Sequence, residues 1–75
     1  MKEVTAGVDI GGTNTKFGLV DRDGNVLTQG SISTQNHDTF EDFIDDMANA
    51  IQQSVAKVGN CQLIGIGVGA ANGNY

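Results

Sequence analysis

Apolar residues occur at every second position near the start of the chain. Polar or small residues separate them, and the apolar members of the alternation are Val4, Ala6, Val8 and Ile10. A period of two is typical of a β-strand that buries one face. After the pair Gly11-Gly12, a second short apolar set runs from Phe17 to Val20, which predicts a second strand.

A second turn follows this strand. Residues 21–25 are polar and contain the pair Asp23-Gly24, and Asp-Gly is a strong signal for a hairpin. The chain is therefore expected to return as a third strand from Val26 to Thr34, in which the apolar residues are Val26, Leu27 and Ile32. Together the three strands form an antiparallel meander.

A helical pattern replaces the alternation after residue 37. Asp38 is the expected N-cap, and Glu41, three residues later, completes the spacing of a capping box. Apolar residues then recur at steps of three and four: Phe40, Phe43, Ile44, Met47, Ile51, Val55 and Val58. Such a stripe is the buried face of an amphipathic helix, which we expect to end at Gly59. His37, beside the expected cap, is interpreted as a solvated or capping group.

The last apolar run covers residues 61–69 and contains no charged residue. It has the pattern of a strand covered on both faces. Because it follows a helix, it is expected to lie parallel to the first strand through a right-handed crossover. The predicted fold is therefore α/β with the order β-β-β-α-β, in which three strands are antiparallel and the fourth is parallel.

Charge and composition limit the function classes. The 75 residues include four basic and nine acidic side chains, a net charge of −5, which argues against a nucleic-acid surface. Neither a signal peptide nor an apolar stretch of about 18 residues is recognisable, so no membrane contact is expected and the expected location is cytoplasmic. The one cysteine, Cys61, is interpreted as a buried apolar residue in a reducing compartment. The acidic residues between Asp38 and Asp46 are interpreted as a solvated helix face.

Candidate chemistry centres on the first turn. Two glycines leave room for positive φ and for an anion to approach the backbone, and converging N–H groups in such a turn bind anions. Thr13 adds a hydroxyl and Lys16 a positive charge. Asp9 would repel a bare phosphate but suits a hydrated Mg²⁺ held between carboxylate and phosphate. The alternative is a plain Gly-Gly hairpin with a solvated Asp9.

The string from Asp9 to Thr13, followed by Gly18-Leu19-Val20-Asp21, resembles the first phosphate motif of the ROK family (repressors, open reading frames and kinases). This family lies in the actin, hexokinase and Hsp70 superfamily. The resemblance therefore implies a ribonuclease-H-like fold, in which residues 1–75 form the N-terminal part of one actin-like ATPase lobe and the second lobe is absent. It also implies ATP and Mg²⁺ as cofactors. On this basis the metal is assigned, through water, to Asp9, and the ATP phosphates are assigned to Gly11, Gly12, Thr13, Asn14 and Lys16.

The end of the chain resembles a second ROK segment. Residues 67–75 are similar to the loop that contributes to the sugar pocket of bacterial glucokinases in this family, except that Ala71 stands where proline is common. The resemblance implies that Asn72 and Gly73 contact the sugar, and an asparagine side chain suits a vicinal diol. A turn asparagine without a sugar role is the alternative. A dinucleotide fingerprint fits poorly, because Asn72 occupies its third glycine position, and no Walker A motif is present.

The resemblance implies the N-terminal part of an ATP-dependent hexose kinase, most directly a glucokinase that converts glucose and ATP to glucose 6-phosphate and ADP. No catalytic residue is assigned within residues 1–75, because the family's general-base aspartate belongs to a later segment. The 75-residue chain is therefore predicted to be inactive alone. The alternatives are a kinase for N-acetylmannosamine, N-acetylglucosamine or fructose, a sugar-responsive regulator, and a non-catalytic folded module. Sugar and ATP are the expected partners, and exposed apolar surface is expected to promote homo-oligomers.

Overall fold

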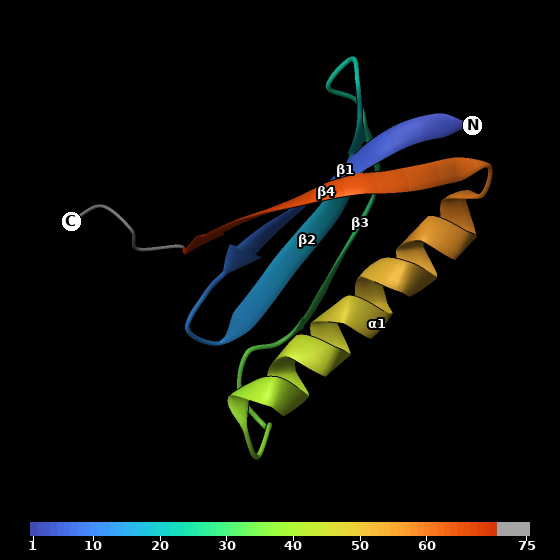
Figure 1. Cartoon of the computed structure of the whole chain (residues 1–75). Helices are drawn as coiled ribbons and strands as arrows, with labels where there is room; N and C mark the ends of the chain where they lie inside the picture. The colour runs from blue at the N-terminus through green and yellow to red at the C-terminus, as the bar shows by residue number, and fades with distance from the viewer. Residues whose placement is uncertain (71–75) are drawn as a thin grey trace.

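The computed structural model describes residues 1–70, which form one mixed sheet and one helix (Figure 1). The strands are β1 (Lys2–Ile10), β2 (Asn14–Asp21), β3 (Val26–Ser33) and β4 (Cys61–Ala70), and the helix is α1 (Phe40–Val58). The sheet order is β3-β2-β1-β4. In it β1 is antiparallel to β2, β2 is antiparallel to β3, and β4 is parallel to β1. The predicted order and strand directions are therefore confirmed.

The helix α1 packs along one face of the sheet (Figure 1) and buries the alternating apolar residues of the first two strands. The buried core consists of Val4, Ala6, Val8, Phe17, Leu19, Phe43, Met47, Ile51 and Cys61. Its helical members all come from the predicted stripe. Ile44, Val55 and Val58 are partly buried against this core, whereas Phe40, the first residue of α1, is 72% exposed, with its ring centroid 6.2 Å from that of Phe43. Within residues 1–70, no helix combines the length and the apolar character that crossing a membrane requires.

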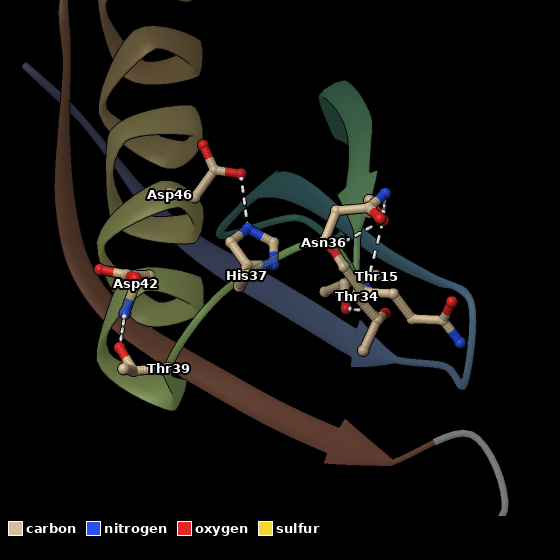
Figure 2. A network of polar contacts seen from close by, with 9 residues as sticks. Thr15, Thr34, Asn36, His37, Thr39, Asp42 and Asp46 are labelled. Carbon is tan, nitrogen blue, oxygen red and sulfur yellow. Dashed lines mark hydrogen bonds and ion pairs between the residues drawn. The ribbon is translucent and has the colours of Figure 1, made fainter.

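The helix starts one residue later than the sequence indicated. Thr39 rather than Asp38 is the N-cap: its backbone is extended, and its hydroxyl accepts a hydrogen bond from the Asp42 N–H at 3.1 Å (Figure 2). Threonine and aspartate both satisfy free amides at a helix start, so the pattern alone did not separate them. The predicted end is confirmed, since Gly59 has φ 73° and its N–H donates to the Val55 carbonyl at 3.0 Å.

The strand β4 is covered over its first residues only. Its exposed large apolar side chains, between 54% and 59% exposed, are Ile64, Ile66 and Val68. The prediction of a strand covered on both faces is therefore wrong for the described residues, in which β4 forms one edge of the sheet. The cause is geometric, because α1 and β4 meet at the turn after Val58 and then diverge (Figure 1). Self-association through this surface stays a prediction.

Asp21 holds the turn between β2 and β3. Its carboxylate accepts hydrogen bonds from the N–H groups of Asp23 and Asn25, both at 2.9 Å, and from the Asn25 side chain at 3.2 Å. Gly24 has φ 87°, a backbone that favours glycine. The bond from the Asn25 N–H is the main cause that lowers the pKa of Asp21 below its ordinary value of 3.8, and the Asn25 side chain, the Asp23 N–H and Lys2 act in the same direction.

The lowered pKa of Asp21 makes the stability of the chain depend on pH. The unfolded chain binds a proton at Asp21 more readily than the folded chain does. The carboxylate therefore stabilises the fold above its ordinary pKa, and this contribution is lost as the pH falls below 3.8 through the folded-state pKa. We expect Asp21→Asn to flatten the pH dependence of the free energy of unfolding, measured by urea denaturation between about pH 2 and 5. An unchanged slope would show that this carboxylate is not its source.

Candidate functional site

One backbone hydrogen bond closes the turn between β1 and β2. The last register pair of the two strands is Ile10 with Thr15, and inside it the Gly11 N–H donates to the Asn14 carbonyl at 3.0 Å. Neither Gly11 nor Gly12 adopts a positive φ, so this turn does not use the left-handed backbone that two glycines allow. Gly11 is required for a different reason, because a Cβ there would lie 2.7 Å from the Asn14 carbonyl oxygen.

Two amides of this turn remain free within the described residues. Gly12 and Thr13 are both exposed, and neither N–H group donates a hydrogen bond to an atom of residues 1–70. Apart from its chain neighbours, nothing lies within 4 Å of the place that a Cβ of Gly12 would take. The turn therefore combines free donors with open space, which is what an anion requires of a backbone site.

Asp9 and Lys16 lie opposite each other on the sheet face that α1 does not cover. They are a register pair of β1 and β2, and the residues before and after them in each strand pack toward α1. Both side chains are exposed, and they form no ion pair in the part of the chain that the structure describes. They border an open depression of about 410 Å³, which is also lined by Gly7, Gly18 and Gly67.

A free carboxylate at this place suits a hydrated cation. Among residues 1–70, no group of three or more His, Cys, Asp or Glu side chains converges to form a metal cage. Mg²⁺ does not need one, since it keeps several waters and is usually held by one or two carboxylates together with phosphates. Asp9 fits the protein's share of such a site, and Lys16 offers a charge for a phosphate oxygen. Both ligand roles stay predictions.

The loop between β3 and α1 forms hydrogen bonds with the turn between β1 and β2, a feature that the sequence did not reveal. The hydroxyls of Thr15 and Thr34 are 2.7 Å apart (Figure 2). The Thr34 N–H donates to the Thr13 carbonyl at 2.9 Å, and the Gln35 side-chain amide donates to the Gly12 carbonyl at 3.2 Å. Thr15 is 0% exposed. Thr15 lies two residues before Phe17 and four before Leu19, on the buried face of β2, and this spacing could have predicted that its side chain is buried.

His37 closes the other end of this loop against α1 (Figure 2). Its Nε2 lies 3.1 Å from Oδ2 of Asp46, and its ring packs edge-on against Phe43 with the ring centroids 5.5 Å apart. The side chain of His37 is only 14% exposed. The interpretation of His37 as a solvated or capping group is therefore wrong, because the residue ties the loop to the helix.

Comparison with known proteins identifies the family to which this arrangement belongs. The model of the ROK family matches residues 5–72, which is most of the chain. The chain belongs to the ROK family. It is 40% identical over 68 residues to the glucokinases of Streptomyces coelicolor and Streptomyces lividans, and the matched segment is 91% of this chain. The resemblance drawn from the sequence motifs is thereby confirmed.

A solved ROK structure has the same fold. The chain resembles the crystal structure of a ROK family glucokinase from Streptomyces griseus in complex with glucose and AMPPNP, with a TM-score of 0.71 and 32% identity over 91% of this chain. The β-β-β-α-β unit corresponds to the N-terminal portion of that structure. The chain spans 20% of its length, and 20% of the length of the two Streptomyces relatives.

The predicted ligand residues of this ROK chain fall into two groups. The sugar-site residues Asn72 and Gly73 lie outside the described residues. The residues predicted to bind phosphate and metal lie together at one end of the sheet. Gly11, Gly12 and Thr13 form the turn and Asn14 starts β2 directly after it, while Asp9 and Lys16 form a register pair near this turn.

Proposed function

We propose that this chain carries the first phosphate-binding hairpin of an ATP-dependent sugar kinase, with glucose as the acceptor. The observation that supports it most directly is the turn of Gly12 and Thr13, where two amides without an acceptor in residues 1–70 meet open space, next to a strand that carries the exposed carboxylate of Asp9. Phosphoryl transfer depends mainly on positioning and charge stabilisation, and such a turn supplies both. The relatives favour glucose among the sugars, because two of them are glucokinases and a third is a glucokinase crystallised with glucose and AMPPNP.

In the proposed complex the turn holds the phosphate tail of ATP. The N–H groups of Gly12 and Thr13 donate to phosphate oxygens, and the Thr13 hydroxyl and Asn14 side chain add neutral donors. Lys16 adds a charge-assisted donor. Asp9 would hold a hydrated Mg²⁺ through water, and the ion would neutralise part of the phosphate charge.

Other parts of the reaction fall to residues outside the described range. Asn72 and Gly73 are proposed to contact the sugar hydroxyls. The general base that accepts the proton of the attacking hydroxyl is assigned to no residue of this chain. The 75-residue chain is accordingly expected to bind a nucleotide without turning it over, and the cytoplasm, which supplies ATP, is the proposed location of the whole protein.

A chimaeric kinase tests this proposal. Residues 5–72 of this chain would replace the matched segment of the Streptomyces griseus glucokinase, and ADP release would be measured with glucose, fructose, N-acetylmannosamine and N-acetylglucosamine. We expect ADP release that depends on glucose. Asp9→Asn in the chimaera should lower it by roughly 10- to 100-fold, the usual effect of losing a group that supports a bound metal through its outer shell.

The control for the chimaera is Gln52→Ala, which changes an exposed residue of α1 and should leave ADP release unchanged. A folded chimaera that releases no ADP with any of the four sugars would contradict the kinase proposal. Preference for another sugar would contradict glucose as the acceptor and keep the kinase.

A further inference from the structure

Gln35 connects the β3–α1 loop to the phosphate turn through its side chain. Its Nε2 donates to the Gly12 carbonyl at 3.2 Å, and one residue earlier the Thr34 N–H donates to the Thr13 carbonyl at 2.9 Å. A carbonyl oxygen can only accept a hydrogen bond, so the amide nitrogen of Gln35 must face Gly12. Two consecutive carbonyls of the turn are thus directed toward the same loop.

The contact at the Gly12 carbonyl sets the orientation of the peptide plane that joins Gly12 to Thr13. In a trans peptide, the C=O and N–H of one plane point in opposite directions. The plane that joins Gly12 to Thr13 therefore turns its N–H away from the loop, which agrees with the absence of any acceptor for the Thr13 N–H in residues 1–70. A rotation of this plane, which is easy beside a glycine, would hide that N–H and present the carbonyl to an anion instead.

We propose that Gln35 is a positioning residue of the phosphate site: it holds the Gly12 carbonyl and thereby keeps the Thr13 N–H turned outward, toward a phosphate oxygen. The inference rests on the proposed function, because the orientation of this N–H matters only if a phosphate binds in the turn. It extends that function by assigning the orientation of a backbone donor to a side chain from another loop.

The loop itself is ordered so that Gln35 starts from a fixed backbone. The Ser33 hydroxyl accepts a hydrogen bond from the Gln35 N–H at 3.2 Å and donates to the Gln35 carbonyl at 2.9 Å. The Asn36 side chain donates to the same hydroxyl at 3.3 Å, and Asn36 takes φ 70°, which asparagine tolerates. On its other side, the contact between His37 and Asp46 fixes the loop to α1. Because these bonds already order the backbone, the contact with Gly12 costs only the rotamer entropy of the Gln35 side chain.

Titration of the 75-residue chain with pyrophosphate and Mg²⁺ tests this assignment. Binding to the wild type and to Gln35→Ala would be measured by calorimetry, and the Thr13 amide signal would be followed by ¹H–¹⁵N NMR. We expect Gln35→Ala to weaken pyrophosphate binding by roughly 3- to 10-fold, the effect of one hydrogen bond, and to shift the Thr13 amide signal in the free chain. Gln35→Glu keeps the shape but, when ionised, cannot donate, so it should weaken binding at least as much.

Gln52→Ala is the matched control, because it removes an exposed glutamine from α1; it should bind pyrophosphate as the wild type does. The urea midpoint of Gln35→Ala should stay near the wild-type value, since its hydrogen bond is exposed. Equal affinity of the wild type and Gln35→Ala would overturn the role of Gln35 and leave the proposed function intact. A loss of affinity that follows a loss of folding stability would also overturn it. A folded wild-type chain that binds no pyrophosphate would overturn both proposals.

Discussion

Alanine in place of Leu19 is expected to unfold the chain. Leu19 is 0% exposed and lies in β2 between its register partners Ala6 of β1 and Thr28 of β3. Replacing a buried leucine by alanine costs about 2–5 kcal/mol, and the single core of a chain of this size rarely supplies more than about 3–5 kcal/mol. Urea denaturation followed by circular dichroism should show a cooperative transition for the wild type and none, or one at much lower urea, for Leu19→Ala.

Val26→Ala is the control for this experiment. Val26 is a branched apolar residue of β3 that is 60% exposed. Its replacement should change the free energy of unfolding by no more than about 0.5 kcal/mol, as is usual for surface positions. If Leu19→Ala unfolded at the wild-type urea midpoint, the packing of α1 over the centre of β2 would be contradicted.

The sheet and the helix could be predicted because their signals are local and repeated. The alternation of apolar residues in β1 and the Asp23-Gly24 turn each indicate one element without reference to the rest of the chain. The helical stripe selects Phe43, Met47 and Ile51, which are the buried residues of α1. The parallel direction of β4 was predicted because the strand follows a helix, and a helix is the usual crossover between parallel strands.

The details that the sequence did not indicate depend on residues brought together by the fold. Thr15 is a buried hydroxyl whose partner, Thr34, lies 19 residues later, and this pairing exists only in the observed register of β2 and β3. His37 was interpreted as a solvated loop residue because its sequence position does not show its contacts with Phe43 and Asp46. These contacts form only when the loop folds back against the first turns of α1. The pattern of apolar residues along one strand or helix does not show which side chains of another element will contact it.

The location of the candidate site could be predicted from its motif, but the contacts that hold its turn in place could not. The motif placed Gly11 and Gly12 at the turn, whereas the steric reason for Gly11 appears only with the position of the Asn14 carbonyl. Gln35 is 23 residues away from Gly12 in the chain, a separation that no spacing rule links to a phosphate motif. The contact between Gln35 and Gly12 depends on how β1, β2 and β3 pair and on where the loop after β3 then lies.

The two glycines of the turn between β1 and β2 are expected to respond to alanine in opposite ways. A Cβ at Gly11 would lie 2.7 Å from the Asn14 carbonyl oxygen, a main-chain atom held by the hydrogen bond that closes the turn. Gly11→Ala should therefore lower the free energy of unfolding by about 1–3 kcal/mol, the usual cost of overpacking. Gly12 has open surroundings and no positive φ. Gly12→Ala should leave stability unchanged or raise it by about 0.4–1 kcal/mol, because alanine restricts the unfolded chain.

Measuring phosphate binding distinguishes the structural role of Gly11 from the proposed ligand-binding role of Gly12. In Gly12→Ala the new methyl group stands in the open space through which, on the proposed function, a phosphate reaches the free amides. Affinity for pyrophosphate and Mg²⁺ should fall by roughly tenfold, the effect of one hydrogen bond to a charged group, while the urea midpoint does not fall. Gly65→Ala, in equally open surroundings on β4, is the control: it should leave the affinity unchanged, and its stability should be unchanged or slightly raised, as for Gly12→Ala. Unchanged affinity in Gly12→Ala would contradict the assignment of Gly12 to the phosphate site. Because affinity and stability are measured on the same variant, the experiment distinguishes a blocked site from a destabilised fold.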